Sequence, residues 1–143
     1  MPHAREILAG VVLSAALAAA PVATACGTDS DCAAEGGSYR IAVPADAARG
    51  AEVGAIVYLH GYQASGAQAM GFAALRDMAD RLGVALIAPN GEGGTWGLPR
   101  VFASRRDDVA FVTGAIEDAV ARFPIDADRI LLTGFSLGGS MAW

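Results

Sequence analysis

Short apolar runs alternate with amphipathic segments along most of the chain, and this alternation limits the fold more than any other feature of the sequence. Runs that are apolar on both faces are typical of buried strands, and apolar residues that recur every three or four positions are typical of helices. The strands are predicted at residues 53–60, 84–88 and 129–133, and the helices at 67–82 and 107–123. Because strands that alternate with helices form parallel units with right-handed crossovers, we predict a doubly wound, mostly parallel α/β sheet with helices on both faces.

Another strand is predicted near the start of the folded part. Residues 38–43 alternate apolar and polar side chains, which indicates a half-buried strand that ends at Pro44, and we expect it at the edge of the sheet. The preceding residues 26–37 contain both cysteines, end in two glycines and are predicted to be a linker. The folded domain is therefore expected to begin at residue 38 and to extend to residue 143.

Cys26 and Cys32 are the only cysteines of the chain. In an oxidising compartment we expect a structural disulfide, either between the two or with a cysteine outside this chain, and closing so small a loop contributes about 2 kcal/mol. Two alternatives stay open. Cys26 could carry a lipid anchor, although such sites usually have Leu where this chain has Ala23, and the two thiols could bind a metal, although no histidine lies nearby.

The first 25 residues have the parts of a cleaved signal peptide. Arg5 precedes an apolar run at residues 7–20, and the segment ends in Ala23-Thr24-Ala25, the small-x-small pattern that signal peptidases accept. The alternative is a buried or membrane-spanning helix, but the run is short for a span and Pro21 interrupts it. We therefore predict a secreted or periplasmic protein without a membrane span.

The charge balance bears on the class of partner. The chain has 15 acidic and 10 basic residues, and its formal net charge is −5. Nucleic-acid binding needs a cationic surface, so the balance argues against nucleic acid as a partner.

The most specific motif is Gly134-Phe135-Ser136-Leu137-Gly138, which matches G-x-S-x-G. It directly follows a predicted buried strand and precedes a predicted helix start, and this strand-turn-helix setting is the one in which such a serine acts as a nucleophile. Gly134 and Gly138 would let the strand and the helix approach closely, and the Leu137 backbone N–H would stabilise an oxyanion. A glycine-rich turn without chemistry is the alternative.

The loop after the first buried strand is expected to supply the second oxyanion donor. The Tyr62 backbone N–H is the candidate, and Gly61 would allow a substrate to approach closely. His60, at the end of the strand, is expected to organise this loop rather than to act as a base. Trp96 could form a wall of the substrate site or pack its own loop, and we favour packing. Asp107 and Asp108 are expected to cap the helix at residues 107–123.

Together these segments resemble the secreted polyhydroxybutyrate depolymerase and feruloyl esterase-like serine esterases of the α/β-hydrolase superfamily. The resemblance covers nearly all of residues 36–143 and lies in the order and spacing of several short segments. They are Gly-Ser-Tyr-Arg at 37–40, Tyr-Leu-His-Gly-Tyr at 58–62, Ala-Pro-Asn-Gly at 88–91, Arg-Asp-Asp-Val-Ala-Phe at 106–111, and Asp-Arg-Ile at 128–130 leading to Thr-Gly-Phe-Ser at 133–136. The chain departs from the family at Leu137, where the family often has Asn.

The resemblance implies an α/β-hydrolase-type sheet and hydrolysis of an ester through an acyl-enzyme on Ser136, without a metal or cofactor. In such hydrolases the triad acid and histidine follow the nucleophile along the chain, whereas no Asp, Glu or His follows Ser136 here. We therefore expect the sequence to be the amino-terminal part of a longer enzyme and to be inactive alone. The strand at 129–133 is expected to be an exposed apolar edge prone to aggregation.

Three functions remain open at this point. The leading one is an exported serine esterase that acts on a polyhydroxyalkanoate, a feruloylated polysaccharide or a small acyl ester. The second is a non-catalytic exported binding protein, and the third is another α/β-hydrolase activity, such as a peptidase or a thioesterase. The fold class alone does not choose among them.

Overall fold

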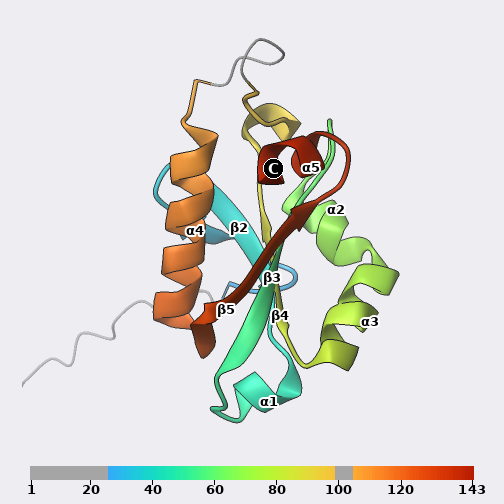
Figure 1. Ribbon diagram of the computed structural model, residues 1–143, viewed down its shortest axis with the longest axis vertical. Helices are drawn as coiled ribbons and strands as arrows, with labels where there is room; N and C mark the ends of the chain where they lie inside the picture. The colour runs from blue at the N-terminus through green and yellow to red at the C-terminus, as the bar shows by residue number, and fades with distance from the viewer. Residues whose placement is uncertain (1–25, 99–104) are drawn as a thin grey trace, which may run out of the picture.

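The computed structural model describes residues 26–98 and 105–143, which form a mixed α/β fold (Figure 1). Its centre is a five-stranded sheet with the strand order β1-β2-β4-β3-β5. The strands are β1 (Cys32–Ala34), β2 (Gly37–Ala42), β3 (Val53–Leu59), β4 (Ala85–Pro89) and β5 (Ile125–Gly134). The helices are α1 (Ala45–Ala48), α2 (Gly66–Gly71), α3 (Ala73–Leu82), α4 (Asp108–Arg122) and α5 (Leu137–Ala142), and η1 (Glu92–Gly94) is a single 3-10 turn. The predicted signal peptide, residues 1–25, lies outside the described residues.

β3 is the central strand of the parallel part of the sheet. It pairs in parallel with β4 on one side and with β5 on the other, whereas β2 runs antiparallel to both β4 and β1. The predicted parallel core is therefore present, and the sheet as a whole is mixed. Because the three parallel strands point the same way, the residues that follow β3, β4 and β5 meet at one edge of the sheet.

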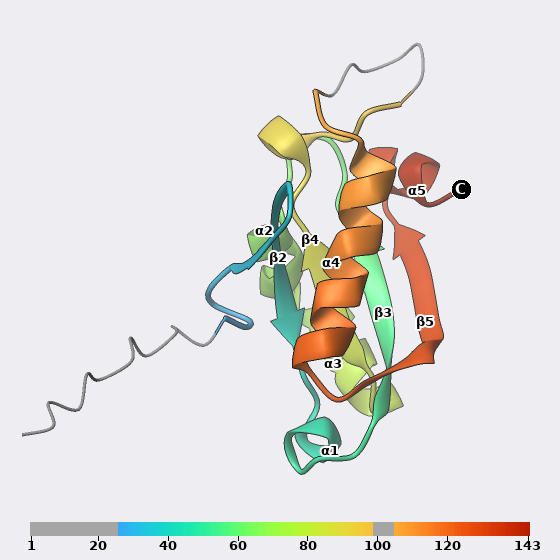
Figure 2. The same cartoon turned by 90° about the vertical axis from the view of Figure 1, so that its left-hand side faces the viewer.

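Helices cover both faces of the sheet, as the alternating pattern predicts (Figure 2). On one face, α4 packs through Phe111, Val112, Ala115 and Ala119 onto alternate residues of β2, β3 and β4, in a core that also contains Leu137 of α5. On the other face, α2 and α3 pack against the opposite side chains, which include Ile56 and Leu86. This arrangement explains why β3 is apolar on both faces.

The predicted edge position of the strand at 38–43 is wrong. β2 lies between β4 and β1, and β1 comes from the segment that we predicted to be a linker. The reason is local: Gly36, with φ 79°, forms the turn of a short hairpin, in which Cys32 pairs with Tyr39. The sheet therefore begins at Cys32, and the two glycines mark a turn inside the domain instead of its boundary.

Two predicted helices differ in detail. The helix at 67–82 is two helices, because Phe72 between α2 and α3 has an extended backbone (φ −81°, ψ 95°). Met78 and Leu82 of α3 are exposed, although both fit the three- and four-residue spacing that is typical of a buried helix face. In α4, Val109 fits the same spacing but is exposed, whereas Phe111 is buried.

A disulfide between Cys26 and Cys32 ties the amino-terminal end of the described chain to β1. An arginine of α4 extends this connection: the Arg122 guanidinium lies 2.8 Å from Cys26 Sγ and donates to Asp118 Oδ2 at 3.0 Å. The Tyr39 hydroxyl donates to the same Asp118 oxygen at 2.6 Å, and burial together with this carboxylate raises the pKa of Tyr39 well above its ordinary value. The hairpin is thus fastened to α4 by polar contacts.

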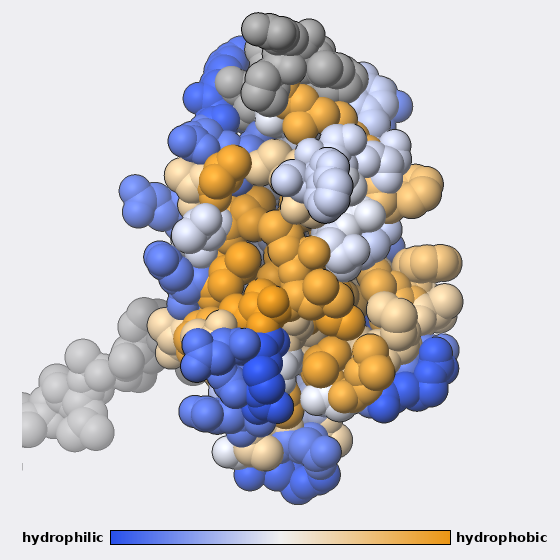
Figure 3. Space-filling view, viewed as in Figure 1, coloured by the Kyte–Doolittle hydropathy of each residue, from blue (hydrophilic) through white to orange (hydrophobic). Residues whose placement is uncertain are grey.

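β5 is the outer strand of the described sheet on the side opposite β1. It is longer than predicted because its first residue, Ile125, already pairs with Val53 across an irregularity in the ladder. Leu131 and Leu132 on this strand are exposed. In the view of Figure 1, β5 crosses the middle of the molecule, and Figure 3 shows an apolar area over the middle of the same face. This agrees with the exposed apolar edge that the sequence predicts. Among the described residues, no helix is long and apolar enough to cross a membrane.

Two glycines provide a test of the helix geometry. Gly83 ends α3 in the left-handed region (φ 64°, ψ 32°), whereas Gly114 lies inside α4, and a Cβ at either position would have open space around it. Steric overlap therefore contributes to neither substitution. Gly83→Ala should lower the free energy of unfolding by about 1 kcal/mol, because L-residues with a Cβ disfavour positive φ. Gly114→Ala should raise it by about 0.5–1 kcal/mol, because alanine is the better helix former. Urea unfolding of both variants measures the difference, and shifts of the same sign would contradict this account.

Candidate functional site

The turn between β5 and α5 presents Ser136 at the edge where the parallel strands end (Figure 1). Ser136 has φ 51° and ψ −117°, a combination that is strained for a residue with a Cβ. Its side chain is exposed, and α5 begins at the next residue, Leu137. The serine of the G-x-S-x-G motif thus occupies the tip of a sharp strand-to-helix turn.

Two glycines let this turn pack directly on the backbone of β3. A Cβ on Gly134 would overlap the backbone of Gly138, and a Cβ on Gly138 would overlap the carbonyls of Leu59 and His60. The Phe135 N–H donates to the Leu59 carbonyl at 3.1 Å, which closes the contact. The spacing of the glycines in the motif therefore has a steric cause, and it brings Ser136 next to the loop that follows β3.

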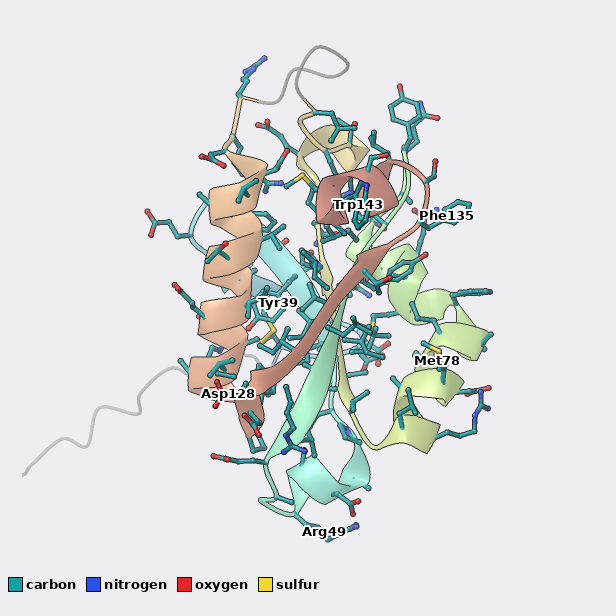
Figure 4. All side chains as sticks on the ribbon, in the orientation of Figure 1. Tyr39, Arg49, Met78, Asp128, Phe135 and Trp143 are labelled. Atoms are coloured by element: carbon teal, nitrogen blue, oxygen red, sulfur yellow. A yellow bond between two sulfur atoms is a disulfide. The ribbon has the colours of Figure 1, made fainter. Side chains whose placement is uncertain are left out.

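A cleft of about 300 Å³ opens beside Ser136. Residues from the end of β3, the following loop, α2 and the turn before α5 line it, including Tyr58, Gly61, Tyr62, Phe72, Phe135 and Ser136. The side chains of Tyr62, Phe72 and Phe135 are each more than half exposed, and Figure 4 shows Phe135 at the turn that carries Ser136. The structure thus brings the predicted residues Gly61, Tyr62 and Ser136 together in one largely apolar cleft.

His60 is buried, and both of its ring nitrogens are engaged. Nε2 accepts the backbone N–H of Gly91 at 3.0 Å, and Nδ1 lies 2.8 Å from the Gly61 carbonyl, to which it donates. Burial lowers the pKa of His60, and the bond to the Gly61 carbonyl opposes this shift. The imidazole is therefore a neutral group that holds the loop, in agreement with the role predicted for it. His60 also lines the cleft with Ser136, but both of its ring nitrogens are used within the loops.

Trp96 does not form a wall of the cleft, contrary to one of its two predicted roles. The side chain is fully buried, its indole N–H donates to the His60 carbonyl at 2.8 Å, and its ring lies 4.9 Å from the imidazole. The reason is that the chain after β4 is bonded to the loop after β3, also through the Gln63 N–H and the Gly94 carbonyl at 2.8 Å, and the indole is buried at this contact. Trp96 therefore packs the loop, the role that we favoured.

Asp107 caps α4 as predicted, but Asp108 does not. The Asp107 carboxylate accepts the Ala110 N–H at 3.0 Å. The Asp108 carboxylate is instead buried, where it accepts the Gly97 N–H at 2.6 Å and a hydrogen bond from Arg106 Nε at 2.8 Å. The prediction failed because adjacent acidic residues at a helix start look alike in sequence, whereas the fold directs one of them inward.

Arg106 extends this buried ion pair to other loops. Its guanidinium donates to the carbonyls of Gly36 at 3.0 Å and Asn90 at 3.2 Å, and it lies 3.7 Å above the ring of Phe111. A Cβ on Gly37 would overlap both the guanidinium and this ring. This structural role of Arg106 is not predicted from the sequence, where its only signal is its place in the segment at 106–111 that carries the resemblance.

The site offers hydroxyl and backbone groups rather than metal ligands. In the described ranges, 26–98 and 105–143, no group of three or more His, Cys, Asp or Glu side chains could hold a metal ion. The chemistry that the geometry can support at Ser136 is nucleophilic attack on an electrophilic centre in the cleft.

No protein-family model matches the chain, and no curated protein is detectably similar to it in sequence.

The close approach at Gly138 leads to a steric prediction. Gly138→Ala should lower the free energy of unfolding by about 3 kcal/mol or more, because the added methyl group meets backbone carbonyls that cannot rotate away. Gly71→Ala is the matched control, since a Cβ there has nothing within contact distance. Urea unfolding followed by circular dichroism measures both, and equal effects would show that the turn is not seated on β3 as described.

The buried ion pair leads to a second prediction for this region. Asp108→Asn should destabilise the fold by about 3–5 kcal/mol, because it leaves the mostly buried Arg106 guanidinium without its counter-charge. Arg49→Gln removes an exposed partner of Asp46 and should change stability little. Thermal unfolding of the two variants tests the contrast. A small effect of Asp108→Asn would mean that the pair does not hold the loops together.

Proposed function

We propose that this chain carries the nucleophile of an exported serine esterase, which hydrolyses carboxylic esters through an acyl-enzyme on Ser136. The observation that carries the proposal is the strained, exposed Ser136 at the turn between β5 and α5, in the same cleft as Gly61 and Tyr62. A strained turn of this kind lowers the stability of the fold, and a role of the serine as a nucleophile would explain why the turn is present.

In the proposed reaction, Ser136 Oγ attacks the ester carbonyl carbon while its proton passes to a general base. The tetrahedral intermediate then collapses, the bond to the alcohol oxygen breaks, and the base returns the proton to the leaving alcohol. Water attacks the acyl-enzyme in the same manner, which releases the acid and restores the serine hydroxyl.

The proposed oxyanion donors are the backbone N–H groups of Leu137 and Tyr62. Leu137 is the residue after the nucleophile, and Tyr62 belongs to the loop after β3 that lines the cleft with Ser136. Backbone donors of this kind stabilise the negative charge that develops on the carbonyl oxygen, and removing one typically slows acyl transfer by about 10²–10³-fold.

The cleft suits an apolar or aromatic part of the substrate. Its exposed rings at Tyr62, Phe72 and Phe135 offer flat apolar surfaces next to the nucleophile. The resemblance implies two substrate classes, and we propose both: a feruloyl-type ester would place its aromatic ring against these surfaces, and a polyhydroxyalkanoate would place its aliphatic side groups there.

The proposed reaction needs a general base, and the one histidine among the described residues is engaged within the loops. His60 uses both ring nitrogens within the loops, the other histidine is His3, and no Asp, Glu or His follows Ser136. We propose that these 143 residues alone are inactive, because no imidazole among the described residues is available to Ser136.

Two further parts of the proposal concern the fold family and the compartment. An α/β-hydrolase-type fold is supported by the parallel core β4-β3-β5 and by the strand-turn-helix setting of Ser136. Export is supported by the signal-like pattern of residues 1–25 and by the disulfide between Cys26 and Cys32, since disulfides persist in oxidising compartments.

A serine-reactive fluorophosphonate tests the nucleophile. The protein is produced from its gene, with any codons that follow the one for Trp143, and the labelled residue is located by peptide mass spectrometry. We expect an adduct on Ser136, its loss in Ser136→Ala, and retention in the control Ser140→Ala, which removes another exposed serine hydroxyl nearby. Labelling that persists in Ser136→Ala, or no labelling of the protein at all, would refute the esterase proposal.

The same probe tests the origin of the general base. If codons that follow the one for Trp143 supply a histidine to Ser136, the 143 residues alone should react at Ser136 at least about 10³-fold more slowly than the whole product, because loss of a triad member has an effect of this order. Equal rates would mean that this chain activates the serine by itself, and the base would then have to be sought among its own residues.

A further inference from the structure

His60 lies between two loops at the edge where the parallel strands end. The first loop, residues 60–65, follows β3 and contributes Gly61 and Tyr62 to the cleft. The second, residues 90–97, follows β4 and contains η1. Buried polar side chains in folded proteins are nearly always hydrogen-bonded. The hydrogen bonds of His60 connect the two loops.

Both the side chain and the main chain of His60 contact the second loop. Gly91 N–H donates to the imidazole Nε2 at 3.0 Å, and the Trp96 indole N–H donates to the His60 carbonyl at 2.8 Å. A third bond joins the loops farther from the imidazole, from Gln63 N–H to the Gly94 carbonyl at 2.8 Å.

The hydrogen bonds select one protonation state of the ring. Nε2 can accept the Gly91 N–H only when it carries no proton, and the neutral imidazole then has its proton on Nδ1, where it donates to the Gly61 carbonyl at 2.8 Å. In the other tautomer the proton is on Nε2, so the Nε2–H would face the Gly91 N–H. The unprotonated Nδ1 would then face the Gly61 carbonyl oxygen, lone pair against lone pair. One tautomer therefore satisfies both contacts, and the other satisfies neither.

The second loop is shaped to reach the ring. A Cβ on Gly91 would overlap the Thr95 carbonyl and lie 3.2 Å from His60 Cε1, so the glycine permits this close approach. On the first loop, Gln63 has a positive φ of 57°, which a non-glycine residue adopts when its surroundings impose it. Its bond to the Gly94 carbonyl is the contact that links this strained residue to the second loop.

We propose that His60 is a positioning residue: as the Nδ1–H tautomer it fastens the loop at 60–65 to the loop at 90–97 and thereby sets the main chain of Gly61 and Tyr62 beside Ser136. The effect of this positioning on catalysis rests on the proposed function. The connection between the two loops is independent of that function and can be measured without any reaction.

Two substitutions separate the two ends of the imidazole. His60→Gln keeps an acceptor near the position of Nε2, where the Gly91 N–H needs one, but loses the donor to the Gly61 carbonyl. His60→Asn keeps a donor near the position of Nδ1 but loses the acceptor for Gly91. Both replace the ring by a smaller neutral amide. Asn is the smaller of the two by one methylene, so the exchange rates are interpreted together with the tautomer of the wild-type ring, which a role in packing alone does not select.

The first measurement is made on the chain in solution at pH 7. Nitrogen-15 NMR of the imidazole should show the neutral Nδ1–H tautomer. Hydrogen exchange at the Gln63 amide then reports the contact between the loops from a position that does not touch the ring. Exchange should be at least about fivefold faster in His60→Asn than in His60→Gln, the effect of losing one neutral hydrogen bond.

Ile41→Val serves as the matched control, because it weakens the buried core in β2, outside the two loops, and should leave the exchange rate at Gln63 close to that of the wild type. An imidazolium or an Nε2–H tautomer in the wild type would overturn the proposal, and so would equal exchange rates in the two His60 variants. If His60→Asn does not fold, the tautomer of the wild type still decides the matter.

Fluorophosphonate kinetics on the protein that labels at Ser136 test the consequence for catalysis. His60→Asn should lower the maximal labelling rate about 10-fold or more with little change in the concentration for half-maximal rate, because a displaced oxyanion donor acts on the transition state. His60→Gln should stay closer to the wild type. Equal rates in the wild type and both variants would overturn the link to Ser136. If the wild type is not labelled but the NMR and exchange results hold, the esterase proposal fails and the fastening of the loops stands.

Discussion

The contact between the turn before α5 and the end of β3 is the constraint on which the site depends. Gly138 lies directly against the carbonyls of Leu59 and His60, and the Phe135 N–H bonds to the first of them. Because backbone meets backbone there, the position of Ser136 is set relative to the loop after β3 without any intervening side chain. Such contacts deform less than contacts between side chains, which suits a site that requires fixed geometry.

Polar contacts hold the loops around this backbone contact. His60 joins the loop after β3 to the loop after β4, while Arg106 and Asp108 tie that second loop to α4 and to the turn between β1 and β2. Each group is buried or mostly buried and satisfied by named partners. Polar networks of this kind add less to net stability than apolar burial does, but they favour one loop arrangement over others because every alternative leaves a buried group unpaired.

Two parts of the exposed apolar surface lie near Ser136 or on the strand that leads to it, and they differ in their surroundings. One consists of the rings that line the cleft beside Ser136, where an apolar lining next to a nucleophile suits substrate binding. The other is β5, whose leucines lie on the outer strand of the described sheet. The two parts are joined through the turn at Phe135, so the strand that positions the nucleophile is also the one least covered by the described residues.

The sequence by itself determined the features that depend on neighbouring residues. These are the strands β3 and β4, the extent of α4 with its cap at Asp107, and the sharp turn at Ser136, because periodicity, caps and glycine spacing act within a few positions. Only the tertiary structure decided that β1 covers β2, that Phe72 separates two helices, that Asp108 turns inward and that Trp96 is enclosed. The inward turn of Asp108 and the enclosure of Trp96 depend on groups that are distant along the chain, such as Gly97 with Asp108, Arg106 with Gly36 and Trp96 with His60, and local patterns carry no record of such pairs.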